Sequence, residues 1–382
     1  MYVTDVELVD FRNYAEAQLE FAPGVNVLVG ANGQGKTNVV EAVAYLATLA
    51  SHRVGVDAPL VRRGAERAVV RARVVAGLDD ARVLTLELEI NPGGANRARL
   101  NRAPQRRARD LLGALRVVVF TPDDLDLVKG DPSSRRDAID DLLVTRWPRL
   151  AGVKADYDKV IRQRNALLKA AAARGRLDAE AADTLDVWDG QLAAFGAEIV
   201  TARAATITDL GPYLAASYEA IAPANNVATA VYAPRQDGLR AYLAADEAPA
   251  PAEVAALLRD ALAERRQDEV RRGVSLVGPH RDEIDLAIGE LPAKGYASHG
   301  EAWSLALAWR LASFHLLRAE AIEPVLILDD VFAELDATRR ARLADEVATA
   351  EQTVITAAVP EDVPAGLLGQ QFVVQAGTVR KA

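Results

Sequence analysis

Apolar and polar residues alternate along much of the first third of the chain. Residues 2–8 have the period-two pattern of an edge strand, and the runs 68–75 and 83–90 have the pattern of an antiparallel sheet. Residues 25–29 are instead uninterruptedly apolar apart from one Asn, which is typical of a buried parallel strand. Apolar residues at helical spacing follow over 38–50. This part of the chain is therefore predicted to consist of strands and one helix.

The middle of the chain, residues 126–273, is rich in alanine and charge and has helical periodicity. Residues 154–173 and 183–210 are the clearest predicted helices, and residues 241–251 are predicted to form an exposed loop. Helix-breaking residues interrupt any sustained heptad pattern: Gly175, Gly190, Gly196, Gly211, Pro212, Pro223, Pro234, Gly238, Pro249 and Pro251. We therefore expect a compact helical lobe in this region and not a long coiled-coil arm.

The last third of the chain returns to mixed strands and helices. We expect a strand at 284–288, a strong helix at 301–318, and further strands at 325–328 and 353–355.

Composition narrows the class of protein. The chain has 382 residues, a formal net charge of −9 and no cysteine, which excludes disulfides, zinc–thiolate sites and a thiol nucleophile. No signal peptide is recognisable, and no apolar run approaches the roughly 20 residues of a membrane span. We therefore expect a cytoplasmic protein with no membrane association.

The net negative charge means that any contact with nucleic acid must use local basic patches. Three groups of arginines are available, although each alone is more typical of a solvated face. They are Arg97, Arg99, Arg102, Arg106, Arg107 and Arg109; Arg135 and Arg136; and Arg265, Arg266, Arg271 and Arg272.

One segment matches the phosphate-binding pattern G-x-x-x-x-G-K-[ST] between the predicted strand and helix. Its residues are Gly30, Ala31, Asn32, Gly33, Gln34, Gly35, Lys36 and Thr37. The glycines let backbone N–H groups and the helix N-terminus face phosphate oxygens. Lys36 is expected to contact the β- and γ-phosphates, and Thr37 to bind Mg²⁺. The segment therefore predicts a nucleotide site with ATP and Mg²⁺ as cofactors.

A second acidic motif follows the apolar run 325–328. Asp329 and Asp330 come at the carboxyl end of this predicted parallel strand, where ligands bind in open α/β sheets. We expect Asp329 to hold hydrated Mg²⁺ and Asp330 to orient or deprotonate the attacking water. Taken alone, an apolar strand that ends in two acids is common and is also compatible with a helix cap or a turn, but together with the segment 30–37 it favours a nucleotide site.

Two further motifs lie close by. Ser298, Gly300 and Glu301 precede a long helix, where they predict either a second phosphate-binding surface or an ordinary capping box, and the two do not exclude each other. Asp336 lies in a short acidic segment after the second motif, as expected of a loop between two nucleotide sites.

These four motifs, in this order, resemble those of the ATP-binding-cassette superfamily. More residues separate Lys36 from Asp329 than a transporter cassette usually has, and within the superfamily the chain resembles the RecF family. The segments that carry this resemblance are 11–14, 30–37, 51–53, 121–125, 128–130, 278–282 and 328–336.

The resemblance implies an α/β fold: an ATP-binding-cassette ATPase head with mixed sheets, formed by 1–125 and 274–382, and a compact helical lobe inserted at 126–273. It also implies a homodimer held by ATP, in which Ser298, Gly300 and Glu301 of one copy close over the nucleotide of the other. Arg12 is either a further phosphate contact or part of a surface salt bridge.

The same resemblance implies a slow, DNA-stimulated ATPase that binds single-stranded and gapped duplex DNA and, with RecR and RecO, helps to load RecA. Two departures from transporters favour a timer over a motor. Asp330 replaces a longer Glu base, and Thr356 stands near the usual place of a switch His. His280 and His299, which lie in the motif loops, are candidates for the composite site. The alternative function is the ATPase subunit of a transporter, which would not respond to DNA.

Overall fold

The computed structural model describes residues 1–222, 227–245, 249–367 and 369–382. Backbone contacts divide the chain into two compact units, which are described separately below. The first consists of Met1–Leu125, Tyr213–Val227 and Ser298–Ala382, and the second of Asp126–Pro212 and Ala228–Ala297. These units place Tyr213–Val227 in the first unit and 274–297 in the second, whereas the division into a head of 1–125 and 274–382 and a helical insert lobe of 126–273 stays a prediction.

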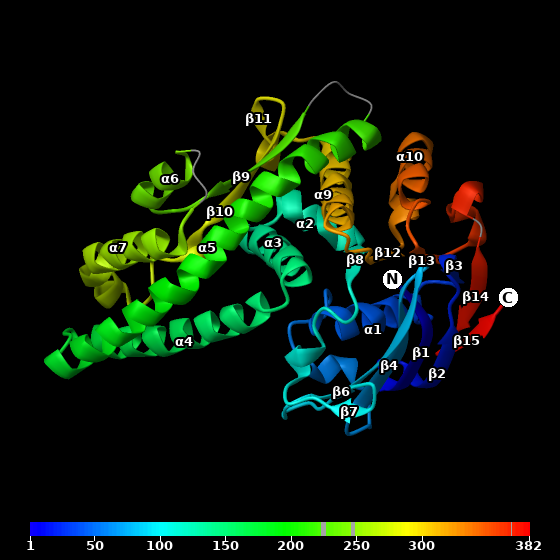
Figure 1. The fold of residues 1–382 in the computed structure, drawn as a ribbon, viewed down its shortest axis with the longest axis horizontal. Helices are drawn as coiled ribbons and strands as arrows, with labels where there is room; N and C mark the ends of the chain where they lie inside the picture. The colour runs from blue at the N-terminus through cyan, green and yellow to red at the C-terminus, as the bar shows by residue number, and fades with distance from the viewer. Residues whose placement is uncertain (223–226, 246–248, 368) are drawn as a thin grey trace. The chain divides into compact units, whose positions relative to one another are not determined.

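The first unit contains a six-stranded antiparallel sheet in the order β2-β1-β4-β5-β6-β7 (Figure 1). Its strands are β1 (Tyr2–Phe11), β2 (Tyr14–Glu20), β4 (Ala68–Gly77), β5 (Asp80–Ile90), β6 (Arg97–Leu100) and β7 (Ala103–Pro104). The edge-strand prediction for 2–8 is wrong, because β1 lies between β2 and β4. Its polar positions form the outer face of an interior strand, where Glu7 pairs with Arg71 of β4 at 2.5 Å.

The second sheet of this unit is mostly parallel, in the order β15-β14-β3-β13-β12-β8. Its strands are β3 (Gly24–Val29), β8 (Val117–Phe120), β12 (Val325–Asp329), β13 (Gln352–Ala357), β14 (Gln370–Gln375) and β15 (Thr378–Lys381). Only β15 pairs antiparallel. The helices of this unit include α1 (Lys36–Thr48), α9 (His299–Ala319) and α10 (Ala337–Val347).

One hydrophobic core joins the two sheets through α1. It contains Leu8 and Val70 from the antiparallel sheet, Val43 from α1, and Ile327 and Val354 from the parallel sheet. All five side chains are buried, so α1 packs between the two sheets. The predicted α/β architecture with mixed sheets is confirmed.

The second unit combines helices with a three-stranded antiparallel sheet in the order β11-β10-β9. Its helices are α2 (Asp126–Lys129), α3 (Pro132–Arg146), α4 (Leu150–Arg174), α6 (Asp237–Leu243), α7 (Pro251–Arg272) and α8 (Ala293–Tyr296). Its strands are β9 (Ala228–Ala233), β10 (Glu283–Ile288) and β11 (Leu291–Pro292). The lobe is therefore not wholly helical, because β9 falls within the segment predicted as helices and loops.

Helix α5 (Ala179–Ile221) runs for 43 residues through Gly190, Gly196, Gly211 and Pro212. The helix predicted at 183–210, which already contains Gly190 and Gly196, is therefore confirmed, but it continues past its predicted end through Gly211 and Pro212. A Cβ on Gly196 would lie 3.3 Å from side-chain atoms of two neighbouring residues, so packing favours a small residue there. Tertiary packing thus outweighs the propensity cost of about 1 kcal/mol for a glycine in a helix.

Other parts of the predictions fall partly outside the described residues. Of the predicted loop 241–251, residues 241–243 belong to the end of α6 and Pro251 begins α7, whereas 246–248 are not described, and neither is Pro223. Within the described ranges, no helix is long and apolar enough to cross a membrane.

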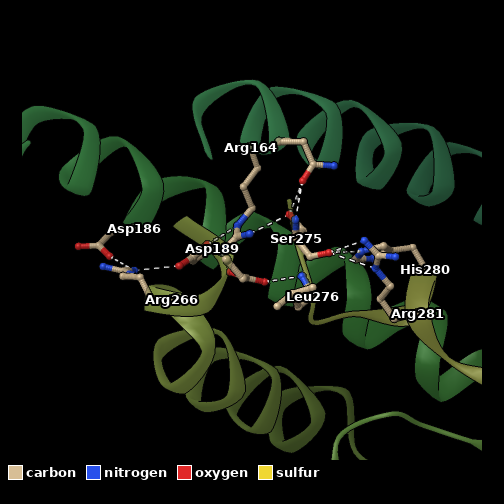
Figure 2. Close-up of polar contacts among 10 residues, drawn as sticks. Arg164, Asp186, Asp189, Arg266, Ser275, Leu276, His280 and Arg281 are labelled. Atoms are coloured by element: carbon tan, nitrogen blue, oxygen red, sulfur yellow. Dashed lines mark hydrogen bonds and ion pairs between the residues drawn. The ribbon is translucent and has the colours of Figure 1, made fainter. Parts of the chain in front are cut away.

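A buried charge cluster holds the helices of the second unit together (Figure 2). Arg164 of α4 is fully buried and donates hydrogen bonds of 2.6 Å to Asp189 of α5 and to Glu269 of α7. Its third bond, of 2.8 Å, goes to the hydroxyl of Ser275, in the segment after α7. The second oxygen of Glu269 accepts the backbone N–H of Leu276 at 2.6 Å. One guanidinium therefore links three helices to the segment that precedes β10.

His280 lies between α7 and β10, in the same segment of the second unit as Ser275. Its Nδ1 is 2.6 Å from the hydroxyl of Tyr157, and its Nε2 is 3.4 Å from the carbonyl oxygen of Ser275. Burial lowers the pKa of His280 to about 4, so the ring is neutral at neutral pH. Both ring nitrogens thus face groups within the second unit, which favours a packing role for His280.

Replacing the central arginine of this cluster tests its contribution to stability. We expect Arg164→Leu to lower the free energy of unfolding by about 3–5 kcal/mol, because the fully buried Glu269 loses its cation and Asp189 keeps only Arg266. Urea unfolding followed by circular dichroism measures the change. Arg174→Ala is the control, since Arg174 forms an exposed pair with Asp178, and its loss costs at most about 0.5 kcal/mol. A change below about 1 kcal/mol for Arg164→Leu would show that the cluster adds little.

Candidate nucleotide-binding site

The parallel sheet brings the two predicted halves of the phosphate site to one edge. Strand β13 lies between β3 and β12, and its register pairs Ala357 with Val29 and Thr356 with Asp329. Since the carboxyl ends of parallel strands share one edge of a sheet, the loop after β3 and the acids after β12 become neighbours. Helix α1 then begins at Lys36, directly after the loop.

Lys36 points back into the phosphate loop. Its Nζ donates to the carbonyl oxygen of Gly30 at 2.8 Å and to the side-chain oxygen of Asn32 at 3.3 Å. It also lies 3.8 Å from a carboxylate oxygen of Asp330. The lysine is 3% exposed, so a buried ammonium occupies the centre of the loop and faces the second acidic motif.

At two glycines of the loop, neighbouring atoms come so close to the backbone that a side chain has no room. Gly35 has a φ of 117°, and a Cβ there would lie 2.7 Å from side-chain atoms of both Asn13 and Tyr14. A Cβ on Gly30 would lie 2.3 Å from the carbonyl oxygen of Val374 in β14. Both positions therefore exclude a larger residue. The remaining predicted loop residues, also between β3 and α1, are Ala31, Asn32, Gly33 and Gln34.

Asp329 is held by two hydroxyl groups. Thr37 donates to its Oδ1 at 3.1 Å and Thr356 donates to the same atom at 2.6 Å. The hydroxyl of Thr356 also accepts the backbone N–H of Asp330 at 2.8 Å. Burial raises the pKa of Asp329, and the charge of Asp330 acts in the same direction, whereas the two hydroxyls oppose the rise. Thr356 thus orients both acids, a role that the site predictions did not include.

The side chains of Thr37 and Asp329 fit a magnesium ion that arrives with a nucleotide. They supply a hydroxyl and a carboxylate oxygen on facing elements, and Mg²⁺ usually takes few protein ligands and completes its shell with water and phosphate oxygens. Across the described ranges, no group of three or more His, Asp or Glu side chains forms a metal site by itself. The donors therefore suit a metal that is shared with a triphosphate.

Arg12 and Arg53 both bind one buried carboxylate. Arg12 contacts Glu41 through Nε at 2.8 Å and Nη2 at 2.5 Å, and its Nη1 donates to the Pro59 carbonyl at 3.1 Å. Ser51 and Arg53 donate to the same carboxylate at 2.6 and 3.2 Å. Burial alone would raise the pKa of Glu41, but these cations and hydrogen bonds outweigh it and lower the pKa. The salt-bridge alternative for Arg12 is thus present, and its contact with phosphate stays a prediction.

The Ser298 segment forms the expected cap of α9. The Ser298 hydroxyl accepts the backbone N–H of Glu301 at 3.3 Å, and the Glu301 carboxylate accepts that of Ser298 at 2.8 Å. Ser298 itself is exposed. A Cβ on Gly300 would lie 3.0 Å from the guanidinium of Arg339, which also pairs with Asp336 at 2.5 Å. The capping-box interpretation is confirmed, and the cap leaves Ser298 accessible.

The predicted site residues therefore fall into two groups, both in the first unit. The first group contains Gly30, Lys36, Thr37, Asp329 and Asp330, and the second contains Ser298, Gly300, Glu301 and Asp336. The site predictions did not include Glu41. The sequence indication for it would have been that a single acidic residue interrupts the apolar run of α1.

Comparison with known proteins identifies the family to which the chain belongs. The family model described as "RecF/RecN/SMC N terminal domain" matches residues 2–365. A protein of Cutibacterium acnes named DNA replication and repair protein RecF is 57% identical, over 99% of this chain and 98% of its own length. The chain belongs to the RecF family. A Frankia alni RecF is 55% identical over the full length of both chains.

Solved structures agree with this RecF-family assignment. One is described as the recombination mediator protein RecF-ATPrS in the RecFOR pathway. It has a TM-score of 0.88 and 26% identity, and the match covers 100% of this chain and 98% of that one. A second, described as RecF-ATP in the same pathway, has a TM-score of 0.87, also with 26% identity, and covers 100% and 97%. An Smc head domain shares the fold. It is 16% identical, with a TM-score of 0.57, and the match covers 100% of this chain and 97% of that one. The predicted ATP-binding-cassette type of head is confirmed.

The lowered pKa of Glu41 predicts a pH-dependent effect of its removal. A carboxylate whose pKa is lowered by folding adds stability above its unfolded pKa, about 4.5, and this stability is lost as the pH falls through the folded pKa. We expect Glu41→Gln to lower the free energy of unfolding by about 2 kcal/mol at pH 7 and by less below pH 4.5. Urea unfolding at several pH values measures the difference.

The matched control for this variant is Glu7→Gln, which removes a carboxylate that is 39% exposed and paired with Arg71. We expect its effect to stay below about 1 kcal/mol at every pH. If the effect of Glu41→Gln on the free energy of unfolding is constant, or grows towards acid pH, the lowered pKa of Glu41 is contradicted.

Proposed function

We propose that the chain binds ATP with Mg²⁺ in the phosphate loop and hydrolyses it slowly, as a switch that controls DNA binding. The observation that carries this proposal is the position of Lys36, inside the loop and 3.8 Å from Asp330, beside the Thr37–Asp329 pair. The likeness to solved structures described as RecF-ATP supports it.

The residues of the first group have distinct roles in this proposal. Backbone N–H groups from Gly30 to Thr37 and the N-terminus of α1 bind phosphate oxygens, and Lys36 neutralises the β- and γ-phosphates. Thr37 and Asp329 hold Mg²⁺, whose charge stabilises the phosphate oxygens when it is bound. Asp330 orients the attacking water and accepts its proton. Arg12 contributes a further phosphate contact.

The second group acts on the nucleotide of another copy. Ser298 is exposed although its hydroxyl caps α9, so it is accessible to a ligand held elsewhere. In the proposed homodimer, Ser298, Gly300 and Glu301 of one copy close over the γ-phosphate in the loop of the other. Asp336, fixed by Arg339, lies in the segment that connects the two sites.

Slow hydrolysis has a local physical cause in this proposal. Asp330 is one methylene shorter than a Glu base, and its backbone N–H is bound to Thr356. Thr356 also binds Asp329, so its hydroxyl is committed to the acids and does not sense the γ-phosphate. The site therefore favours long residence of ATP over rapid turnover.

The names of the relatives support a role in DNA repair over the transporter alternative. We propose that the ATP-held dimer binds single-stranded and gapped duplex DNA in the cytoplasm. With RecR and RecO as partners, it helps to load RecA. Hydrolysis then ends the bound state, so that ATP acts as a timer.

ATP turnover measured with no DNA, single strand, duplex and gapped duplex tests this function. We expect at least a several-fold stimulation by DNA, largest with the gapped duplex, because DNA binding and the closed dimer favour each other. Lys36→Ala, which removes the phosphate-binding cation, controls for contaminating ATPases and should show no turnover. Equal turnover in all four conditions would remove the DNA-switch proposal and favour the transporter alternative.

A further inference from the structure

The six arginines between residues 97 and 109 differ in their charge partners. On β6, Arg97 pairs with Glu89 at 3.5 Å and Arg99 pairs with Glu87 at 2.8 Å, both across the sheet on β5. The other four have no ion-pair partner within the described ranges: Arg102, Arg106, Arg107 and Arg109. We call these four residues the basic hairpin. Three of them are exposed and Arg109 is half-buried.

The backbone holds the basic hairpin in a fixed shape. Asn101 and Arg102, which connect β6 to β7, have φ values of 51° and 69°, in the left-handed region that residues other than glycine avoid. Asn101 is tied to Thr85 of β5 through its backbone N–H, at 2.8 Å, and through its side-chain oxygen, at 2.9 Å. Further along, the backbone N–H of Arg107 donates to Asp110 at 3.0 Å. These bonds hold the backbone that carries the cations, next to β6 and β7 (Figure 1).

The other two basic groups of the chain are largely neutralised within the second unit. Arg135 is buried and forms two hydrogen bonds, of 2.8 and 2.9 Å, with Glu283. Arg265 and Arg271 share Asp268, at 3.7 and 2.7 Å. Arg266 pairs with Asp186 and Asp189, and Arg136 donates to the carbonyl oxygen of Asp282. Of the three groups, the one at the β6–β7 turn thus retains the most unpaired positive charge.

We propose that the basic hairpin binds the phosphate backbone of DNA. This inference rests on the proposed function and adds the surface through which DNA is held. Guanidinium groups match phosphate oxygens geometrically, and an arginine without an acidic partner gives up no ion pair when it binds. The chain carries a net charge of −9, so a local cluster of four unpaired cations supplies the attraction that the whole molecule lacks. The contact reads no bases and is independent of sequence.

The test compares two double variants that change the net charge equally. Arg106→Gln/Arg107→Gln removes two unpaired cations, and Arg97→Gln/Arg99→Gln removes two paired cations from the neighbouring strand. Binding of a fluorescent DNA duplex is measured at several salt concentrations with ATP and Mg²⁺. For the first variant, we expect the slope of log affinity against log salt to fall in magnitude by about 2, at about 0.9 per phosphate contact. The control should keep the wild-type slope.

Arg102→Asn is a second variant, because asparagine accepts the left-handed backbone at this position. It should reduce the magnitude of the slope by about 1. Equal slopes for wild type and all variants, or a loss confined to Arg97→Gln/Arg99→Gln, would overturn the proposed surface and leave the proposed function standing. Wild-type protein that binds no DNA would overturn both. Circular dichroism and ATP affinity, unchanged in each variant, confirm that the first unit is intact.

Discussion

The hydrogen bond between Thr37 and Asp329 joins two residues that are 292 positions apart, and the proposed chemistry depends on it. It forms because β3, β13 and β12 run parallel and end at one edge, which brings the phosphate loop against the second acidic motif. Helix α1, buried between the two sheets, fixes the loop from the other side. A shift of one residue in the register of β12 would turn Asp329 away from Thr37 and separate the proposed metal-binding pair.

Charge is distributed differently at the site and in the second unit. Arg164 is buried with its carboxylates, and this complete pairing makes it a structural group whose role is to hold helices together. At the site, Lys36 bonds mainly to neutral oxygens and faces the carboxylate of Asp330 at 3.8 Å, so its charge stays available for phosphate. Ser298 is similarly ordered by its cap yet exposed. The same chain thus combines complete pairing of Arg164, which suits a structural role, with incomplete pairing of Lys36, which suits the proposed binding of phosphate.

The sequence was sufficient to predict the elements whose chemistry is local. The phosphate loop, the acids that end β12 and the cap of α9 each depend on residues close together in the chain, and the structure places them as expected. Thr356 and Glu41 could not be assigned in this way. Their partners are Asp329, at the end of the neighbouring strand β12, and Arg12, in the turn between β1 and β2, and only the folded structure brings these residues together.

The errors have the same origin. The helix predicted at 183–210 ended before Gly211 and Pro212, which local propensity disfavours in a helix, whereas α5 continues through both to Ile221. The alternation in β1 correctly indicated one solvated face, whereas its place between β2 and β4 depends on hydrogen bonds that the pattern does not contain. Sequence alone thus predicted whether a segment is a helix or a strand better than it predicted which elements lie next to that segment.

The central claim is that the phosphate loop is half of a site that a second copy completes. Sedimentation velocity of the Asp330→Asn variant, which retains ATP because its base is removed, tests this claim most directly. At micromolar concentration we predict a dimer with ATP and Mg²⁺ and a monomer without ATP. Adding Ser298→Arg should restore the monomer while ATP affinity stays unchanged, because the loop itself is intact. A protein that binds ATP and remains a monomer, or a dimer that Ser298→Arg does not disrupt, would contradict the account.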